Sequence, residues 1–189
     1  MLEVITEAVV LDKEDLGEQD SRVFLYTKDL GKIAAKATSA RKITSKLAGN
    51  LQPFNLITAR LISKQNFFDG KGFQLADALS IDNSKNLKSD PELLSEAIKT
   101  FDLIRRSIPE GVPDRELWKF LEEILNKEAP VHLSNALQIL GFDSAYAVCE
   151  LCDNSKPGYF FPKNNFFVCQ SCRAVSNEIK NNFIKLLWI

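Results

Sequence analysis

The sequence predicts an α+β fold, in which an N-terminal β-barrel is followed by a helical domain that carries a four-cysteine metal module. Three observations lead to this prediction. The first part of the chain is rich in short strand-forming segments, apolar residues repeat at helical spacing from about residue 89 onward, and all four cysteines fall between residues 149 and 172. The 189 residues suffice to bury a core and suit one domain or two small ones. We expect a barrel domain over residues 1–82 and a helical domain over residues 83–189, with the zinc module at residues 149–172.

Five segments near the N-terminus have the composition and the apolar alternation of β-strands. They are residues 4–11, 22–27, 32–38, 56–63 and 73–81. A polar stretch, Ser39 to Asn50, makes the connection after the third segment the long one. Five short strands with this connection are typical of a small closed barrel of the OB (oligonucleotide- and oligosaccharide-binding) type. An SH3-like barrel fits the same strand count.

The remainder of the chain has the periodicity of helices. Asp90-Pro91 has the residue types of an N-cap and a first helical position, and Gly141 is typical of a helix end. Residues 81–150 hold eight bases and thirteen acids, which makes this part a poor candidate for contact with nucleic acid. The expected helices cover residues 91–108, 114–125, 133–140 and, after the cysteines, 175–189.

The four cysteines are spaced C-x2-C-x16-C-x2-C. Each pair can place two thiolates on one tight turn, and the sixteen residues between the pairs can fold back as a hairpin, for which Lys156 to Gly158 would supply the turn. Two disulfides or a redox C-x-x-C are the competing interpretations, but a cytosolic chain disfavours the first and the duplicated pair disfavours the second. A shell of four sulfurs leaves no position for water and does not need His132, so the expected zinc is structural. Its expected ligands are Cys149, Cys152, Cys169 and Cys172.

Charge is segregated along the N-terminal part. The first twenty residues hold seven acids and one base, whereas residues 30–68 hold seven bases and no acid. A positive field of this length attracts polyanions, of which the phosphate backbone is the commonest. With Arg22 added, the candidate nucleic-acid contacts are Arg22, Lys32, Lys36, Arg41, Lys42, Lys46, Arg60 and Lys64.

These contacts would neutralise phosphates, so binding should weaken with salt and depend little on base sequence. Phe54, Phe67 and Phe68 are further candidates that could stack on bases. Phenylalanines in a barrel more often belong to its core, so the basic residues carry the hypothesis.

The sequence marks no catalytic constellation. Phosphate-binding loops of the G-x-x-x-x-G-K-[ST] and G-x-G-x-x-G types are absent, as is the G-x-S-x-G elbow, and the chain has one histidine. We therefore expect a binding protein and not an enzyme. The N-terminus carries acids where a signal peptide carries lysines, and the apolar runs are too short to span a bilayer, so we expect a cytoplasmic location.

Several runs resemble the bacterial DNA repair protein RecO family. The N-terminal part of the resemblance lies in residues 8–11, 17–22 and 25–33, then in Arg41-Lys42, residues 45–47 and residues 51–54. Further on, Leu140-Gly141-Phe142 before the cysteines resembles the start of that family's zinc-binding segment. The similarity extends in order over most of the chain and is loose through the helices.

The resemblance implies an N-terminal OB-fold followed by a helical domain with a zinc module. It also implies recombination mediation without ATP: binding single- and double-stranded DNA, annealing complementary strands, and loading recombinase with RecR on DNA coated by single-strand-binding protein. The alternative function is a zinc-ribbon and OB adaptor that binds RNA or an acidic protein.

Three departures from the family pattern are visible. Lys163 to Asn165 stand where glycines are common before the second cysteine pair, and Ala37 to Ala40 where a glycine is common in the basic loop. Family members usually continue with further helices after the second pair, whereas one helix is expected here. We therefore expect a short member, in which the contact with the tail of single-strand-binding protein is in doubt.

Overall fold

The computed structural model describes residues 2–63, 72–82, 85–126, 131–143, 146–175 and 183–186. The chain divides into two compact units, one of residues 1–94 and 109–130 and the other of residues 95–108 and 131–189. The first contains the barrel and the second contains the cysteines. The expected domain boundary between residues 82 and 83 remains a prediction.

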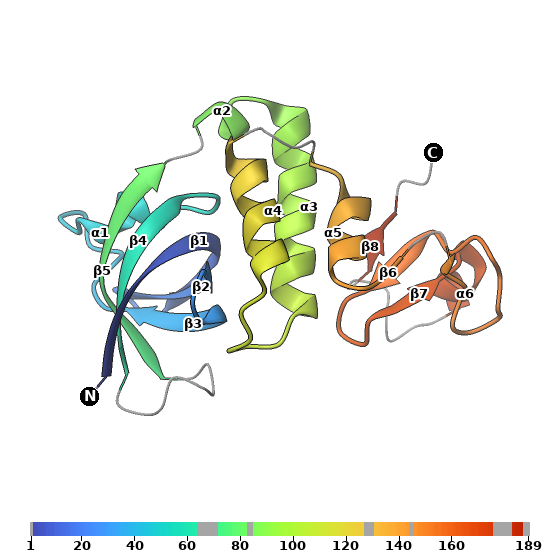
Figure 1. Cartoon of the computed structure of the whole chain (residues 1–189), viewed down its shortest axis with the longest axis horizontal. Helices are drawn as coiled ribbons and strands as arrows, with labels where there is room; N and C mark the ends of the chain where they lie inside the picture. The colour runs from blue at the N-terminus through green and yellow to red at the C-terminus, as the bar shows by residue number, and fades with distance from the viewer. Residues whose placement is uncertain are drawn as a thin grey trace. The chain divides into compact units, whose positions relative to one another are not determined.

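The N-terminal strands close into a five-stranded barrel (Figure 1). Its strands are β1 (Leu2–Leu16), β2 (Asp20–Thr27), β3 (Gly31–Ala37), β4 (Leu56–Ser63) and β5 (Phe73–Asp82). Their order around the barrel is β1-β2-β3-β5-β4, and the pairing is antiparallel except between β3 and β5. The short helix α1 (Leu47–Asn50) lies in the long connection after β3. The predicted OB-type barrel and the α+β class are confirmed.

Alternate residues of the strands fill the barrel interior, as the period-2 pattern predicts. On β2 and β3, for example, Val23, Leu25, Ile33 and Ala35 are at most 1% exposed and belong to one apolar cluster. The residues between them face outward. On β2 and β3 these outward residues form cross-strand pairs, which are Arg22 with Lys36, Phe24 with Ala34 and Tyr26 with Lys32.

Helix α4 (Arg115–Asn126), in the same unit, docks beside this outer face of β2 and β3. The Tyr26 ring stacks on Trp118, with 6.5 Å between the ring centroids. The Tyr26 hydroxyl donates a hydrogen bond to the Asp114 carbonyl at 3.1 Å and accepts one from the Asp114 amide at 2.8 Å. Asp114 also caps α4, because its Oδ1 accepts hydrogen bonds from the amides of Glu116 and Leu117.

The loop before α4 lies against β3, and Gly31 makes this close approach possible. A Cβ at Gly31 would lie 2.2 Å from the Val112 carbonyl oxygen, and the φ of Gly31 is 64°. The Gly111 amide donates a hydrogen bond to the Lys32 carbonyl at 2.9 Å, and Glu110 forms a parallel bridge with Lys32. One end of the outer face of β2 and β3 is thereby covered.

The helices begin where their capping residues predict. The Asp90 side chain accepts hydrogen bonds from the amides of Glu92 and Leu93 at the start of α3 (Pro91–Ser107). The predicted second and third helices correspond to α4 and to α5 (Leu133–Ile139). A further short helix, α2 (Lys85–Lys88), precedes α3.

The cysteine module contains a three-stranded sheet, ordered β7-β6-β8, that the sequence predicted only in part. Its strands are β6 (Tyr159–Phe161), β7 (Phe166–Val168) and β8 (Ile184–Lys185). The prediction of a hairpin turn at residues 156–158 was wrong, because β6 and β7 flank residues 162–165. Residues 156–158 precede β6.

The prediction of a last helix over residues 175–189 was wrong for residues 183–186, the part of that range that the structure describes after Val175. Helix α6 (Gln170–Val175) ends where the prediction began, and Ile184 and Lys185 pair with β6 as a third strand. Phe183 packs edge-on against Tyr159 at 6.2 Å and contacts Phe161 at 5.1 Å between centroids. Aromatic and β-branched residues favour strands once a neighbouring edge is present, and helical spacing over a few residues does not exclude this.

Candidate metal centre and nucleic-acid interface

Two short turns hold the four cysteines. In the first, the amides of Cys152 and Asp153 both donate hydrogen bonds to the Cys149 carbonyl, at 3.3 and 2.8 Å. In the second, Cys169 follows β7 and Cys172 lies in α6, where its amide donates to the Cys169 Sγ at 3.5 Å. The turn at Cys149 is attached to the sheet by a 2.9 Å hydrogen bond from the Glu150 amide to the Phe167 carbonyl in β7. The two C-x-x-C turns are therefore positioned by the hairpin between them.

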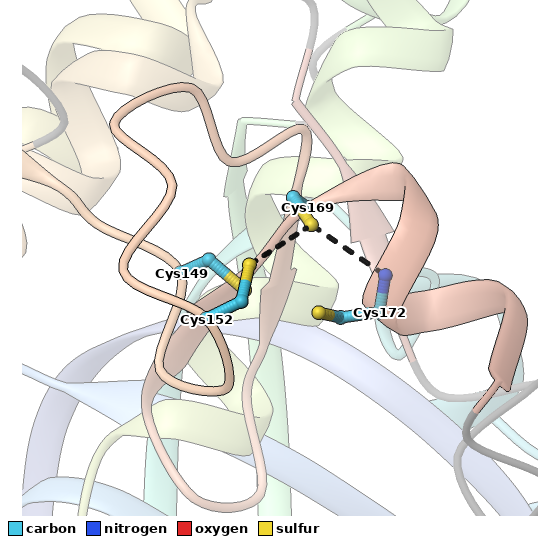
Figure 2. Close-up of side chains that lie close together, drawn as sticks. All are labelled: Cys149, Cys152, Cys169 and Cys172. Carbon is cyan, nitrogen blue, oxygen red and sulfur yellow. Dashed lines mark hydrogen bonds between the residues drawn. The ribbon is translucent and has the colours of Figure 1, made fainter.

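The four sulfur atoms converge on one point (Figure 2). All four Sγ atoms lie within 4.8 Å of one another, and the Cys152 and Cys169 Sγ atoms are 3.7 Å apart. A tetrahedron with metal–sulfur bonds of about 2.3 Å has edges of about 3.8 Å, so this separation fits metal coordination without rearrangement. Cys149 and Cys169 are buried, whereas Cys152 is exposed. The metal position is thus enclosed on one side and borders solvent on the other.

The thiol pKa values diverge because the groups are crowded. Burial raises the pKa of Cys149, but hydrogen bonds from the backbone at Cys169 and Leu151 and from neighbouring thiols outweigh burial and lower this pKa to about 7. The Cys152 thiol, followed by the Cys169 thiol and burial, raises the pKa of Cys172 to about 12. Four thiolates at such distances repel one another, and a divalent cation at their centre removes this repulsion. The four cysteines are positioned to bind a metal ion.

Aromatic side chains pack around the module. The Phe160 ring lies 5.1 Å from both Phe142 and Phe167. The apolar cluster at the metal position is small and includes Cys149, Val168 and Cys169.

Three of the predicted nucleic-acid contacts form ion pairs with acids of β1 and β2. Lys36 lies 2.8 Å from the Asp20 carboxylate, and Arg41 lies 3.1 Å from that of Asp15. Arg60 on β4 binds both carboxylate oxygens of Glu3 on β1, at 2.7 and 3.1 Å. The acidic and basic segments, separate in the sequence, are therefore adjacent in the barrel. Phosphates would have to compete with carboxylates at these three cations.

Three other predicted contacts are exposed. Arg22 lies on β2, and Lys42 and Lys46 lie in the connection before α1. Within the described ranges, none of these three side chains is within ion-pair distance of a carboxylate. Their charges are the ones most accessible to a polyanion.

The remaining candidate contacts are either buried or lie outside the described residues. Lys32 is 9% exposed, because the loop before α4 covers its end of β3. Phe54 is 7% exposed and is therefore buried, which does not suit base stacking. Lys64, Phe67 and Phe68 lie outside the described residues.

Sequence reasoning missed a cavity on the barrel. It has a volume of about 540 Å³ and lies where Phe24 and Ala34 face outward beside Arg22 and Lys36. Glu110, from the loop before α4, lines it as well. No signal in the sequence places Glu110, 86 residues after Phe24, in the same cavity, since that depends on how α4 docks.

The fold and the site together define a protein with an OB-type barrel and a four-thiolate metal module. Residues 1–68 match the family model described as "Recombination protein O N terminal". The chain is also 25% identical to DNA repair protein RecO of Caldanaerobacter subterraneus subsp. tengcongensis, an alignment that covers 93% of this chain and 73% of the relative. It is 29% identical to DNA repair protein RecO of Myxococcus xanthus, with 91% and 73% covered, and 26% identical to that of Dehalococcoides mccartyi strain 195, with 96% and 76% covered. The chain is thus similar to DNA repair protein RecO over most of its length, at 25–29% identity to these three relatives, and its first 68 residues match the family's N-terminal model.

Among the helices that the structure describes, none is long and apolar enough to cross a membrane.

Proposed function

We propose that this protein is a recombination mediator that binds DNA through the outer surface of its barrel and anneals complementary strands. The observation that carries the proposal is the exposure of Arg22, Lys42 and Lys46, none of which has an ion-pair partner among the described residues. These side chains would bind phosphates of either strand, and Lys36, Arg41, Arg60 and Lys64 would add to them. Binding of this kind releases counterions and reads no base sequence.

Annealing follows from the same contacts. Two complementary strands repel each other through their phosphates, and a protein that neutralises part of this charge lowers the barrier to pairing. Contacts to the backbone leave the base edges accessible. Nothing in this mechanism requires a bond to be made or broken, so the proposed function is not enzymatic.

The similarity to DNA repair protein RecO supports the choice of partners. We propose that the protein works with RecR and single-strand-binding protein to load recombinase, in the cytoplasm at the nucleoid. RecR binding would be tested by co-elution of the two purified proteins in size-exclusion chromatography. Two separate peaks at micromolar concentrations would contradict this part of the proposal.

We propose that the metal is zinc and that its role is structural. Four thiolates in a tetrahedral arrangement are the ligand set that Zn²⁺ favours, and they leave no open position for a substrate. Iron is the main competitor for such a set. Metal analysis of the purified protein should give about one zinc per chain, and iron as the dominant metal would overturn the assignment.

DNA binding is tested by fluorescence anisotropy with single-stranded DNA over a salt series. The variant R22Q/K42Q/K46Q should lower the slope of log K against log[salt] by about 2, since each phosphate contact to a single strand contributes about 0.7. The matched control R115Q/K156Q/K163Q removes the same charge from exposed positions outside the barrel strands and should leave the slope unchanged. Equal slopes for wild type and both folded variants would contradict the proposal.

A further inference from the structure

Helix α4 covers part of the outer face of β2 and β3, and the cavity lies on the part that α4 leaves uncovered. Along the outer face of β2 and β3, Tyr26 stacks on Trp118 of α4, whereas the next pair, Phe24 and Ala34, lines the cavity. The volume of about 540 Å³ lies within the range of about 300–1,000 Å³ that is usual for sites that bind small molecules. The cavity is therefore large enough for a single nucleotide.

The side chains in this cavity have three distinct chemistries. Phe24 is half-buried and offers an aromatic surface, and the small side chain of Ala34 beside it leaves room for a planar group. Arg22 and Lys36 are exposed cations that line the same cavity. Glu110 contributes a carboxylate from the loop before α4. An aromatic surface, cations and one acceptor suit a nucleotide better than they suit an apolar ligand or an isolated anion.

Backbone contacts hold Glu110 in place. Glu110 is bridged to Lys32 of β3, and the adjacent Gly111 amide donates its hydrogen bond to the Lys32 carbonyl at 2.9 Å. The close contact at Gly31 leaves this loop little freedom to move away from β3. Glu110 is exposed, and within the described part of the chain its carboxylate has no hydrogen-bond or ion-pair partner. A positioned acceptor without a partner can select a ligand by its donors.

We propose that the cavity binds one unstacked guanine of single-stranded DNA. Guanine presents two adjacent donors, N1–H and N2–H, which fit both oxygens of a carboxylate, so Glu110 would accept two parallel hydrogen bonds. The base would stack on Phe24, and Arg22 would bind a flanking phosphate. This inference rests on the proposed DNA-binding function and adds base selectivity at one position.

The other bases fit the carboxylate less well. Adenine and cytosine each offer one amino group and no second donor beside it, and the N3–H of thymine lies between two carbonyl oxygens that a carboxylate repels. The expected order of preference is guanine, then adenine and cytosine, then thymine. Since one cavity holds one base, the neighbouring bases remain available for annealing.

The test compares two labelled fifteen-nucleotide strands, one of thymidine alone and one with a single central guanine. Fluorescence anisotropy with the full-length protein should show tighter binding of the guanine strand by about fivefold or more, because a bidentate contact to a base discriminates at least to that extent. Glu110→Gln should remove this difference, because the glutamine amide offers one acceptor oxygen in place of two. Glu116→Gln, an exposed acid on α4, is the matched control and should keep the difference.

The outcomes separate this inference from the function on which it rests. If the wild type binds both strands equally in a salt-dependent manner, the guanine site is refuted while DNA binding stands. If the guanine strand binds more tightly and Glu110→Gln retains the whole difference, the role of Glu110 is refuted. If neither strand binds, the proposed function and the guanine site both fall.

Discussion

The acids of the β1–β2 hairpin should restrain DNA binding, and removing them should strengthen it. Asp15 and Asp20 pair with Arg41 and Lys36, at 3.1 and 2.8 Å. Hydrogen bonds from the Lys36 side chain and then from the Ser39 amide hold the pKa of Asp20 below its usual value, so this carboxylate stays charged at neutral pH. A phosphate can bind these two cations only by displacing the aspartates.

The variant D15N/D20N makes the two cations available without removing the local structure. An asparagine at position 20 keeps an oxygen that can accept the 2.8 Å hydrogen bond from the Ser39 amide. Solvent-exposed ion pairs contribute little to folding, so stability should change little. Two additional phosphate contacts should steepen the salt dependence by about 1.4, which corresponds to about a sevenfold larger loss of affinity between 50 and 200 mM salt.

The assay is anisotropy of a labelled single strand titrated with wild type and variant, with circular dichroism to confirm folding. The control variant E7Q/E96Q also raises the net charge by two, but the bases that it releases, Lys28 and Lys99, are not among the predicted contacts. An increase in affinity and slope for D15N/D20N alone is the expected result. Equal binding by both variants would refute the competition between acids and phosphates.

Three further predictions concern stability. Removing the metal with a chelator should lower the Tm, because structural zinc contributes on the order of 10 kcal/mol to the folding of small modules. An unchanged melting curve in calorimetry would contradict a structural role. Gly31→Ala should destabilise the protein by about 3 kcal/mol, because the residue has a left-handed backbone and its new Cβ would clash with Val112. Gly17→Ala is the control, since Gly17 has a similar φ but no atom within 4 Å, and it should cost about 1–2 kcal/mol. Equal midpoints of urea unfolding for the two variants would count against the clash. Tyr26→Phe should cost about 1–3 kcal/mol by leaving the Asp114 amide unpaired, whereas the Asp114 carbonyl still accepts a hydrogen bond from the Trp118 amide. Burial raises the pKa of Tyr26 to about 12 from its usual 10.0, so the stability that the neutral Tyr26 hydroxyl contributes is complete below pH 10 and is lost as the pH rises toward 12. Urea unfolding of the phenylalanine variant should not show that loss. Parallel curves of stability against pH for the two proteins would contradict this prediction.

Most of the barrel could be predicted from the sequence because its strands follow period-2 alternation. The expected strand over residues 56–63 agrees with β4 residue for residue. β1 extends farther than expected, to Leu16, because its register with β2 shifts between Val10 and Asp12, and an irregularity of this kind interrupts the alternation. The strand β8 could not be predicted, since two residues form a strand only when another edge is adjacent.

The metal centre and the nucleic-acid interface also differ in how far the sequence predicts them. The cysteine cluster depends on local spacing within two turns, so its geometry follows from the sequence. The ion pairs depend on strand register: Glu3 and Arg60 are 57 residues apart and meet because β1 pairs with β4. The predicted positive surface is therefore smaller than the acid-free window suggests, and the cavity at Glu110 depends on the docking of α4.

The central claim is that the barrel binds and anneals DNA through exposed basic side chains, and the most direct test is an annealing assay. Two complementary labelled oligonucleotides are mixed without ATP, and pairing is followed by fluorescence quenching over a salt series. We expect the metal-loaded wild type to accelerate pairing at low salt, with an effect that fades as salt rises and is largely lost in R22Q/K42Q/K46Q. A folded wild-type protein that leaves the rate of pairing unchanged at every salt concentration would contradict the account.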